Sequence, residues 1–265
     1  ALQKAKILRN SLIGGATGLL LFLFLLWNRY RMKVRTNQEL EAKNKIIEAE
    51  KARSEALLLN ILPRQTAEEL KATGKAAARK YDSVTVLFTD FVAFTQIAEQ
   101  TQPEELVAEL DECFRAFDDI ISRFNIEKIK TIGDAYMCAG GLPEKNDTHP
   151  EDVVRAALEM RDFMTHFAEK QRANGRPEFK IRLGIHTGPV VAGVVGSKKF
   201  VYDIWGDAVN LAARMEQSGV PGKVNISRHT FELVRGKFRT EYRGKIEAKN
   251  KGPVEMYFIE NQPVD

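Results

Sequence analysis

The stretch Glu127-Lys-Ile-Lys-Thr-Ile-Gly-Asp-Ala-Tyr-Met137 predicts two short strands folded back on each other. Its Gly133-Asp134 pair suits a two-residue type II′ turn, because the first turn position takes a positive φ that glycine adopts without strain. The tip of this hairpin carries the carboxylate of Asp134, and the ammonium of Lys130 lies four residues earlier. Mixed charge on a turn is commonly only solvated surface, so the hairpin alone indicates a fold element and leaves its chemistry open.

A second stretch gives the hairpin carboxylate a partner. Residues 83–88 form a nearly continuous apolar strand, and Asp90 follows it directly, ahead of a helix-like segment. A carboxylate at the end of a buried strand, beside exposed backbone groups, is well placed to hold a hard cation through oxygen. We therefore expect Asp90 and Asp134 to lie on adjacent strand ends, where they could share two metal ions.

Composition narrows the class of protein. The 265 residues are 44% hydrophobic and 29% charged, as in globular proteins, and the formal net charge is +4. That charge suits a small polyanionic substrate or a membrane surface, and no basic run with interleaved aromatic residues indicates nucleic acid. The two cysteines, Cys113 and Cys138, lack metal-site spacing and lie in apolar contexts, which favours buried reduced thiols and a cytosolic catalytic part.

Residues 10–30 are predicted to form a transmembrane helix. From Asn10 to Asn28 no side chain is ionisable, and a helix of that length spans roughly 28 Å, close to the bilayer core of about 30 Å. A cleaved signal peptide is the competing interpretation, but the apolar run is long for one and no small-residue cleavage site follows it. The basic cluster at 29–35 favours a cytoplasmic C-terminal side, hence a single-pass membrane protein with a cytoplasmic C-terminal domain. Residues 1–9 are expected to be the remnant of an upstream region, since the chain begins with alanine.

Residues 31–81 are predicted to form a signalling helix and a linker. From Thr36 to Leu62 the sequence is rich in Glu, Lys and Ala without Gly or Pro, and apolar residues recur at heptad spacing. This pattern indicates a short parallel coiled coil, with a solvated rigid spacer as the alternative. Pro63 is expected to end the helix, because proline disfavours the α region for the residue before it.

Residues 82–265 are predicted to form one α+β domain. After the strand at 83–88 come helices around 94–100 and 103–124, the hairpin, and a long helix from about His149 to Arg172. Two strands follow, 179–186 and 190–195, joined at Thr187-Gly188-Pro189, and then a helix over 206–217 and a final strand at 254–259. This order is typical of an antiparallel sheet with helices on one face.

Common nucleotide and hydrolase motifs are missing from the sequence. The glycines of Gly193-Val-Val-Gly196-Ser197-Lys198 lack the spacing of a phosphate-binding Walker loop, and no GxSxG elbow occurs. Four scattered histidines make neither a zinc site nor a catalytic triad.

Three stretches together resemble the signatures of the class III nucleotidyl cyclases. They are Phe88-Thr-Asp90-Phe-Val-Ala-Phe-Thr95, Lys128-Ile-Lys130-Thr-Ile-Gly-Asp134, and Tyr202-Asp203-Ile-Trp-Gly-Asp-Ala-Val-Asn210-Leu-Ala-Ala-Arg214. The likeness covers roughly residues 82–260, and Leu59-Asn-Ile-Leu-Pro63 is similar to the signalling helix before such domains in membrane-anchored bacterial members. The resemblance implies a ferredoxin-like antiparallel sheet with helices and an adenylate cyclase that makes cyclic AMP and pyrophosphate from ATP.

The resemblance also implies a role for each matching residue at the reacting centre. Asp90, Asp134 and the backbone carbonyl near Phe91 would bind two divalent cations, Mg²⁺ or Mn²⁺. Arg214 would face the α-phosphate, and Asn210, one helical turn earlier, would orient the ribose. Both point the same way because they are four residues apart on a helix.

The remaining matches concern the rest of the nucleotide. Lys249 corresponds to the family's lysine for the terminal phosphates, although Asn250 stands where glycine is common, and Lys198 is a second candidate phosphate contact. Lys130 and Asp203 stand at the two base-reading positions. A lysine donor with an aspartate acceptor suits the N1 and N6 groups of adenine, so ATP is the expected substrate.

In this family one subunit supplies the metal aspartates and the other the base-reading and Asn/Arg residues. This chain carries both sets, which implies a head-to-tail homodimer with sites at the subunit interface. A guanylate cyclase and a catalytically inactive signalling or dimerisation module are the alternatives. Lys130 and Asp203 disfavour the first, and the presence of all four metal and Asn/Arg residues disfavours the second.

Overall fold

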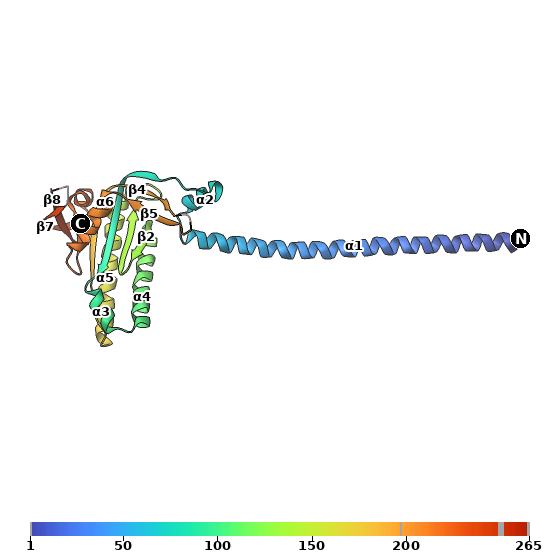
Figure 1. Cartoon of the computed structure of the whole chain (residues 1–265), viewed down its shortest axis with the longest axis horizontal. Coiled ribbons are helices and arrows are strands. Elements are labelled where there is room, and N and C mark those ends of the chain that lie inside the picture. Colours follow the sequence, from blue (N-terminus) through green and yellow to red (C-terminus); the bar gives the residue numbers. More distant parts are fainter. Residues whose placement is uncertain (1, 197, 249–251, 264–265) are drawn as a thin grey trace. The chain divides into compact units, whose positions relative to one another are not determined.

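The computed structural model describes residues 2–196, 198–248 and 252–263 and divides into two compact units, Ala1–Asn60 and Ile61–Asp265. Figure 1 shows the first as one long helix and the second as a sheet with helices packed on it. The division follows the change from a chain without internal tertiary contacts to a chain with a buried core. Each unit is described by itself.

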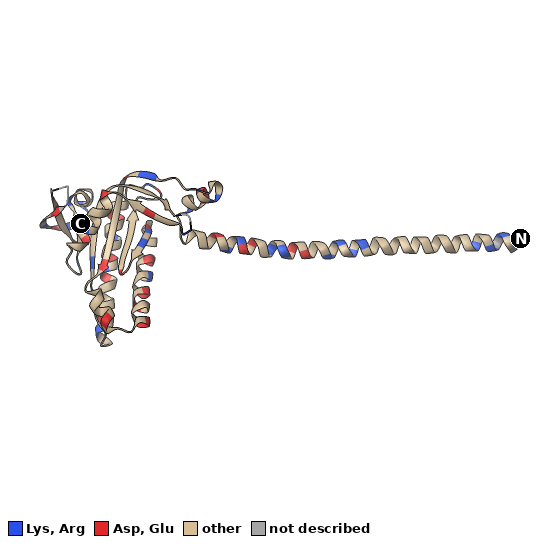
Figure 2. Cartoon of the chain, in the orientation of Figure 1, with Lys and Arg blue, Asp and Glu red and all other residues tan. Residues whose placement is uncertain are grey.

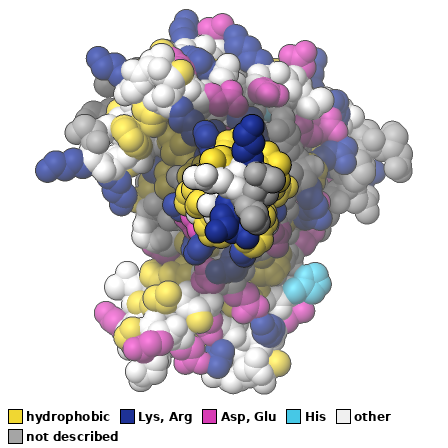
Figure 3. Space-filling model, turned by 90° about the vertical axis from the view of Figure 1, so that its right-hand side faces the viewer, with side chains coloured by type: hydrophobic (Ala, Val, Ile, Leu, Met, Phe, Trp, Pro, Cys, Tyr) yellow, Lys and Arg dark blue, Asp and Glu magenta, His cyan; other side chains and the backbone are white. Residues whose placement is uncertain are grey.

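The first unit is a single helix, α1 (Leu2–Leu59). Residues of the predicted transmembrane helix and signalling helix therefore share one uninterrupted helix, as expected where no proline interrupts the backbone hydrogen bonds. Figure 2 shows a long stretch of α1 without charged side chains, and in Figure 3 hydrophobic side chains ring the helix. Within the described residues, one helix is long and apolar enough to cross a membrane.

The second unit begins before the predicted domain start at residue 82. After Pro63 the chain forms α2 (Arg64–Thr73), which Gly74 ends in the left-handed conformation at φ +73°. Leu62 and Ala67 are buried, and the Arg79 guanidinium pairs with the Glu69 carboxylate at 2.9 Å. Part of the predicted linker thus packs with the second unit.

The second unit is built on a mixed sheet in the order β2-β3-β1-β4-β6-β8-β7, with β5 paired to β4. Its strands are β1 (Arg79–Phe91), β2 (Ile126–Ile132), β3 (Ala135–Gly140), β4 (Ile181–Val195), β5 (Val201–Trp205), β6 (Val224–Ser227), β7 (Phe238–Ala248) and β8 (Gly252–Pro263). All pairings are antiparallel except β4 with β6, which is parallel. The α+β expectation is confirmed, with this one departure from an antiparallel sheet.

The two strands predicted on either side of Thr187-Gly188-Pro189 are one continuous strand, β4, so that expectation was wrong. Proline usually interrupts a strand because it has no amide hydrogen to donate. Here the pairing of β1 with β4 shifts register between Tyr81 and Val84, opposite Pro189. Because the bulge lies opposite Pro189, the missing amide hydrogen does not interrupt the pairing, and β4 continues past the proline.

Helices cover both faces of the sheet, not the one face that was expected. The long helices α4 (Pro103–Ser122) and α5 (His149–Ala173) lie side by side, and their apolar residues share one core with Leu183 and Ile185 of β4. Because side chains alternate along a strand, the intervening Gly184 faces the opposite side. There α6 (Asp207–Gln217) packs so closely that a Cβ on Gly184 would meet a backbone nitrogen of the helix at 1.9 Å.

Two short helices, α3 (Phe94–Gln100) and α7 (Arg228–Val234), complete the second unit. Both cysteines are free and buried, as the sequence predicts, and burial raises the pKa of the Cys113 thiol to about 12.

Candidate active site

The predicted hairpin forms as expected and presents Asp134 at its tip. Ile132 of β2 faces Ala135 of β3 across the two-residue turn, and Gly133 has φ +63°. Asp134 does not share this positive φ, as a type II′ turn requires. The turn therefore holds the Asp134 carboxylate at the end of the hairpin that pairs with β1.

Asp90 and Asp134 come together, and we call them the carboxylate pair. β1 and β3 pair with Thr89 opposite Tyr136, which brings the end of β1 beside the hairpin tip. Burial raises the pKa of the Asp134 carboxyl, and the charge and hydrogen bonding of Asp90 raise it further, while backbone amides of Asp134 and Phe91 oppose the shift. Two carboxylates that repel each other favour a proton or a cation between them.

The carboxylate pair fits divalent cations that are shared with a substrate. Among the residues that the structure describes, no group of three or more His, Cys, Asp or Glu side chains could hold a metal ion by itself. Mg²⁺ commonly binds to one or two carboxylates and completes its shell with water and substrate phosphates. Phe91, whose carbonyl is the predicted third ligand, has its ring fixed in the core against Phe179 at a centroid distance of 5.4 Å. That packing fixes the backbone beside the pair.

Two residues beside the pair were not predicted from the sequence. Arg182 lies opposite Asp90 in the pairing of β1 with β4, and its Nη2 donates to Asp90 Oδ2 at 2.7 Å. Its Nε lies 2.8 Å from an oxygen of Glu216 at the end of α6. Burial raises the pKa of the Glu216 carboxyl to about 7, against the lowering effect of Arg182. Asp90 and Arg182 are 92 positions apart in the sequence, and no local motif predicts that the strand pairing brings them together.

The predicted base-reading residues, Lys130 and Asp203, also meet, and we call them the Lys–Asp pair. Lys130 Nζ donates to Asp203 Oδ2 at 2.5 Å, and Asp203 Oδ1 accepts from the backbone amide of Ile204. The Asp203 side chain is 12% exposed and that of Lys130 is 34% exposed. A bulge in β2 between Lys128 and Lys130 turns the second lysine away from the face covered by α4, where Lys128 bonds Asp118.

Asn210 and Arg214 both lie on α6, and we call them the α6 pair. Asn210 is exposed, and Arg214 is half-buried, with its Nη1 3.5 Å from the carbonyl oxygen of Glu247. Their spacing of four residues places them on one side of the helix. Within the described part of the chain, no hydrogen bond or ion pair joins the α6 pair or the Lys–Asp pair to the carboxylate pair.

Two lysines, Lys198 and Lys249, were predicted from the sequence to contact phosphates. Lys198 is exposed in the connection between β4 and β5. Lys249 lies outside the described residues.

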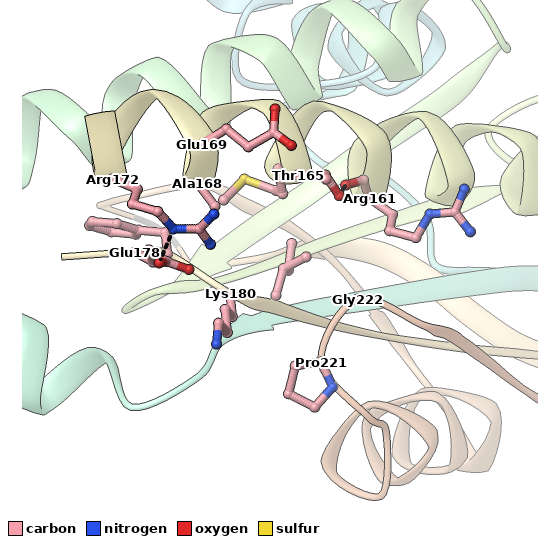
Figure 4. Close-up of a pocket in the computed structure, with 12 residues that line it drawn as sticks. Arg161, Thr165, Ala168, Glu169, Arg172, Glu178, Lys180, Pro221 and Gly222 are labelled. Carbon is pink, nitrogen blue, oxygen red and sulfur yellow. Dashed lines mark hydrogen bonds and ion pairs between the residues drawn. The ribbon is translucent and has the colours of Figure 1, made fainter. Parts of the chain in front are cut away.

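A separate pocket of about 410 Å³ opens between α5 and the start of β4 (Figure 4). Arg172 and Glu178 form an ion pair at 2.7 Å on its rim, and Pro221 and Gly222 lie across from them. Its mixed charges are already paired in part, and none of the predicted site residues line it.

Comparison with known proteins agrees with this geometry. Residues 76–261 match the family model described as "Adenylate and Guanylate cyclase catalytic domain". An adenylate cyclase from Mycobacterium bovis is 41% identical over 215 residues, which is 81% of this chain and 48% of that protein. This chain thus spans about half the length of that relative.

Solved structures of both nucleotide specificities are similar to this chain. The adenylyl cyclase CyaB from P. aeruginosa matches with a TM-score of 0.67 at 27% identity, over 70% of this chain and 97% of that one. The guanylate cyclase domain of RhGC from Catenaria anguillulae, solved with GTP, matches with a TM-score of 0.65 at 34% identity, over 69% and 99%. The overall fold therefore does not distinguish the two substrates.

Proposed function

Because this chain belongs to the adenylate and guanylate cyclase catalytic-domain family, the class III nucleotidyl cyclases, we propose that it converts ATP to 3′,5′-cyclic AMP and pyrophosphate. The ribose 3′-oxygen attacks the α-phosphorus, the bond to the β-phosphate oxygen breaks, and pyrophosphate leaves. The observation that carries the choice of ATP is the contact between Lys130 and Asp203 at 2.5 Å.

The Lys–Asp pair complements adenine. Adenine presents an acceptor at N1 and a donor at N6, whereas guanine presents a donor at N1 and an acceptor at O6. Lys130 can donate to adenine N1, and Asp203 can accept from adenine N6. The adenine edge would thus replace the contact between the two side chains. Guanine would leave polar groups of the pair without partners, at a cost of roughly 1–3 kcal/mol for each group.

The residues of the carboxylate pair, with the Phe91 carbonyl, would hold two divalent cations. Such cations lower the pKa of the ribose 3′-hydroxyl and offset negative charge on the phosphates. The repulsion between Asp90 and Asp134, which raises the pKa of the latter, supports this role because a bound cation would relieve it.

The α6 pair would act on the sugar and the α-phosphate. Arg214 would stabilise charge on the α-phosphoryl group in the transition state, where loss of one such contact costs about 3 kcal/mol or more. Asn210 would hold the ribose so that its 3′-oxygen lies in line with the breaking bond. Lys198 and Lys249 would contact the terminal phosphates.

A homodimer would complete each site, with the carboxylate pair of one subunit facing the Lys–Asp pair and the α6 pair of the other. The missing bonds between these groups within the described part of one chain support this arrangement. Mixing an Asp90→Ala chain with an Arg214→Ala chain tests it. Each variant alone should be inactive, and the mixture should regain up to about a quarter of the wild-type activity, because random pairing leaves one intact site in half of the dimers.

We also propose that α1 anchors the enzyme in the inner membrane, with the catalytic unit in the cytoplasm and signals reaching it along the helix. Its uncharged stretch with a basic cluster on the C-terminal side supports this orientation. Fractionation of cells that express the full chain should place it in the membrane, and engineered disulfides in different registers of residues 36–59 should change the activity. Release from the membrane by salt without detergent would contradict the anchor. Activity that does not depend on the disulfide register would contradict the signalling role.

The deciding experiment measures cyclic nucleotide production with Mn²⁺ and either ATP or GTP, beside an Asp90→Ala control. Cyclic AMP from ATP that disappears in the control would establish the activity. Cyclic GTP would instead identify a guanylate cyclase, which the similarity to guanylate cyclases makes the second candidate. If a chain shown to be dimeric made no cyclic nucleotide from either ATP or GTP, it would be an inactive signalling module.

The base-reading assignment has its own test. The double change Lys130→Glu with Asp203→Cys should move the ratio of kcat/KM for ATP and GTP towards GTP by about tenfold to a hundredfold. Retention of the wild-type preference for ATP would overturn the assignment.

A further inference from the structure

Arg182 lies between two acidic side chains at the edge of the carboxylate pair. One arm of its guanidinium bonds Asp90 at 2.7 Å, and its Nε faces Glu216 at 2.8 Å. The second contact is an ion pair without the alignment of a directed hydrogen bond. The positive charge of Arg182 is therefore divided between a predicted metal ligand and a carboxylate of α6.

The fold holds Glu216 in this position through close packing of backbone. Gly184, two residues after Arg182 on β4, leaves room for the last turn of α6, since a Cβ there would collide with Glu216. Gly219 lets the following loop close over the same residue, where a Cβ would meet the Glu216 carbonyl oxygen at 2.7 Å. The Glu216 side chain is 7% exposed, so above its pKa of about 7, where the carboxyl is ionised, its charge acts on Arg182 with little screening by water.

We propose that Glu216 is a positioning residue that holds Arg182 back from Asp90 and so keeps the Asp90 carboxylate able to bind a divalent cation. The inference rests on the proposed metal-binding role of Asp90. A cation and a guanidinium compete for the same carboxylate oxygen, and they compete less when a second carboxylate shares the guanidinium. Without the charge of Glu216, Arg182 would satisfy Asp90 alone.

A purely structural role for Glu216 makes a different prediction. If Glu216 only supported the end of α6, its loss would weaken the site through misfolding, and removing Arg182 as well would add damage. If Glu216 restrains Arg182, removing the competing guanidinium should restore the site. The sign of the second change therefore separates the two explanations.

The test measures the binding of Mn²⁺ alone to the full chain in detergent micelles. The electron paramagnetic resonance signal of free Mn²⁺ is the readout. Asp90→Asn assigns the site, and Glu178→Gln is the matched control, because Glu178 also pairs with an arginine, Arg172, but at the separate pocket (Figure 4). Glu216→Gln should weaken Mn²⁺ binding roughly three- to tenfold. Adding Arg182→Gln to that variant should recover most of the loss, and Glu178→Gln should match the wild type.

Two results would overturn the proposal. Unchanged Mn²⁺ affinity in Glu216→Gln would show that Glu216 does not restrain Arg182, and a loss that the double variant deepens would indicate a structural role. If Mn²⁺ binding to the wild type did not depend on Asp90, the proposed metal site itself would fail, and this inference with it. Intact wild-type binding beside unaltered variants would overturn this inference alone.

Discussion

The carboxylate pair and the Lys–Asp pair lie in the same sheet and have opposite electrostatic character. Burial raises the pKa of Asp134, and the neighbouring Asp90, which repels it, raises that pKa further. Lys130 and Asp203 attract each other and bond at 2.5 Å. In the proposed function, the first pair gains from a bound cation, whereas the second exchanges its internal bond for contacts with a base. A cation bound at the first pair would relieve repulsion, whereas a base bound at the second pair would replace an existing contact.

The largest effect should come from removing one half of the repelling pair. Asp134→Asn should lower cyclase activity about a hundred- to thousandfold, because the site would hold more weakly the cations that offset negative charge in the transition state. In the presence of a chelator, the same change should leave the melting temperature equal to or above that of the wild type, because it removes a like-charge contact. Activity assays and thermal unfolding test this, with the exposed Asp119→Asn as control, and a large drop in melting temperature would contradict the comparison.

Breaking the attracting pair should instead reduce stability. Lys130→Met leaves the Asp203 carboxylate, which is 12% exposed, without its cation, and should cost about 1–3 kcal/mol in the free energy of unfolding. Lys128→Met is the matched change on the same strand, where the pair with Asp118 is more exposed, and should cost less than about 1 kcal/mol. Equal losses in chemical denaturation would show that burial does not distinguish the two lysines.

Glu127, on the same strand as Lys130, gives a pH-dependent effect. Burial raises the pKa of its carboxyl from 4.5 to about 7, so the folded chain holds this proton more tightly than the unfolded chain. The contribution to stability is complete below pH 4.5 and disappears as the pH rises through about 7. Glu127→Gln should therefore reduce the fall in stability between pH 5 and 8 by about 1–2 kcal/mol. An unaltered pH profile of unfolding would contradict this.

The smallest effect is expected at an attracting pair outside the site. Arg172 and Glu178 bond at 2.7 Å, but the arginine side chain is 66% exposed. Glu178→Gln should leave the free energy of unfolding and the nucleotide preference close to those of the wild type, because water screens such pairs. A change comparable to that of Lys130→Met would mean that attraction alone, without burial, governs these pairs.

Several features of the molecule could be predicted from local sequence. The glycine of the hairpin turn, the proline that ends α1 and the uncharged stretch of the first helix each act through the backbone of neighbouring residues. The meeting of Asp90 with Asp134 and of Lys130 with Asp203 was also expected, the latter from the resemblance to a family, and the structure places both pairs in contact.

Other features could not be predicted because they depend on contacts between distant segments. Pro189 indicated a break between two strands, yet a bulge in β1 lets β4 continue past it. The parallel pairing of β4 with β6, and the packing of α6 on the face opposite α5, depend on how the chain crosses the sheet. Strand pairing and helix placement of this kind are determined by the burial of whole surfaces, so no short sequence pattern predicts them.

The sequence by itself determined the family, the residue types of the two pairs and the presence of a long apolar helix, because residue types and short spacings carry that information. Only the tertiary structure placed Arg182 and Glu216 beside Asp90, through antiparallel register on one side and a glycine-permitted helix contact on the other. The physical reason is that charge sharing depends on distances of a few ångströms between segments far apart in the chain. Those distances are fixed by the packing of the sheet against α6.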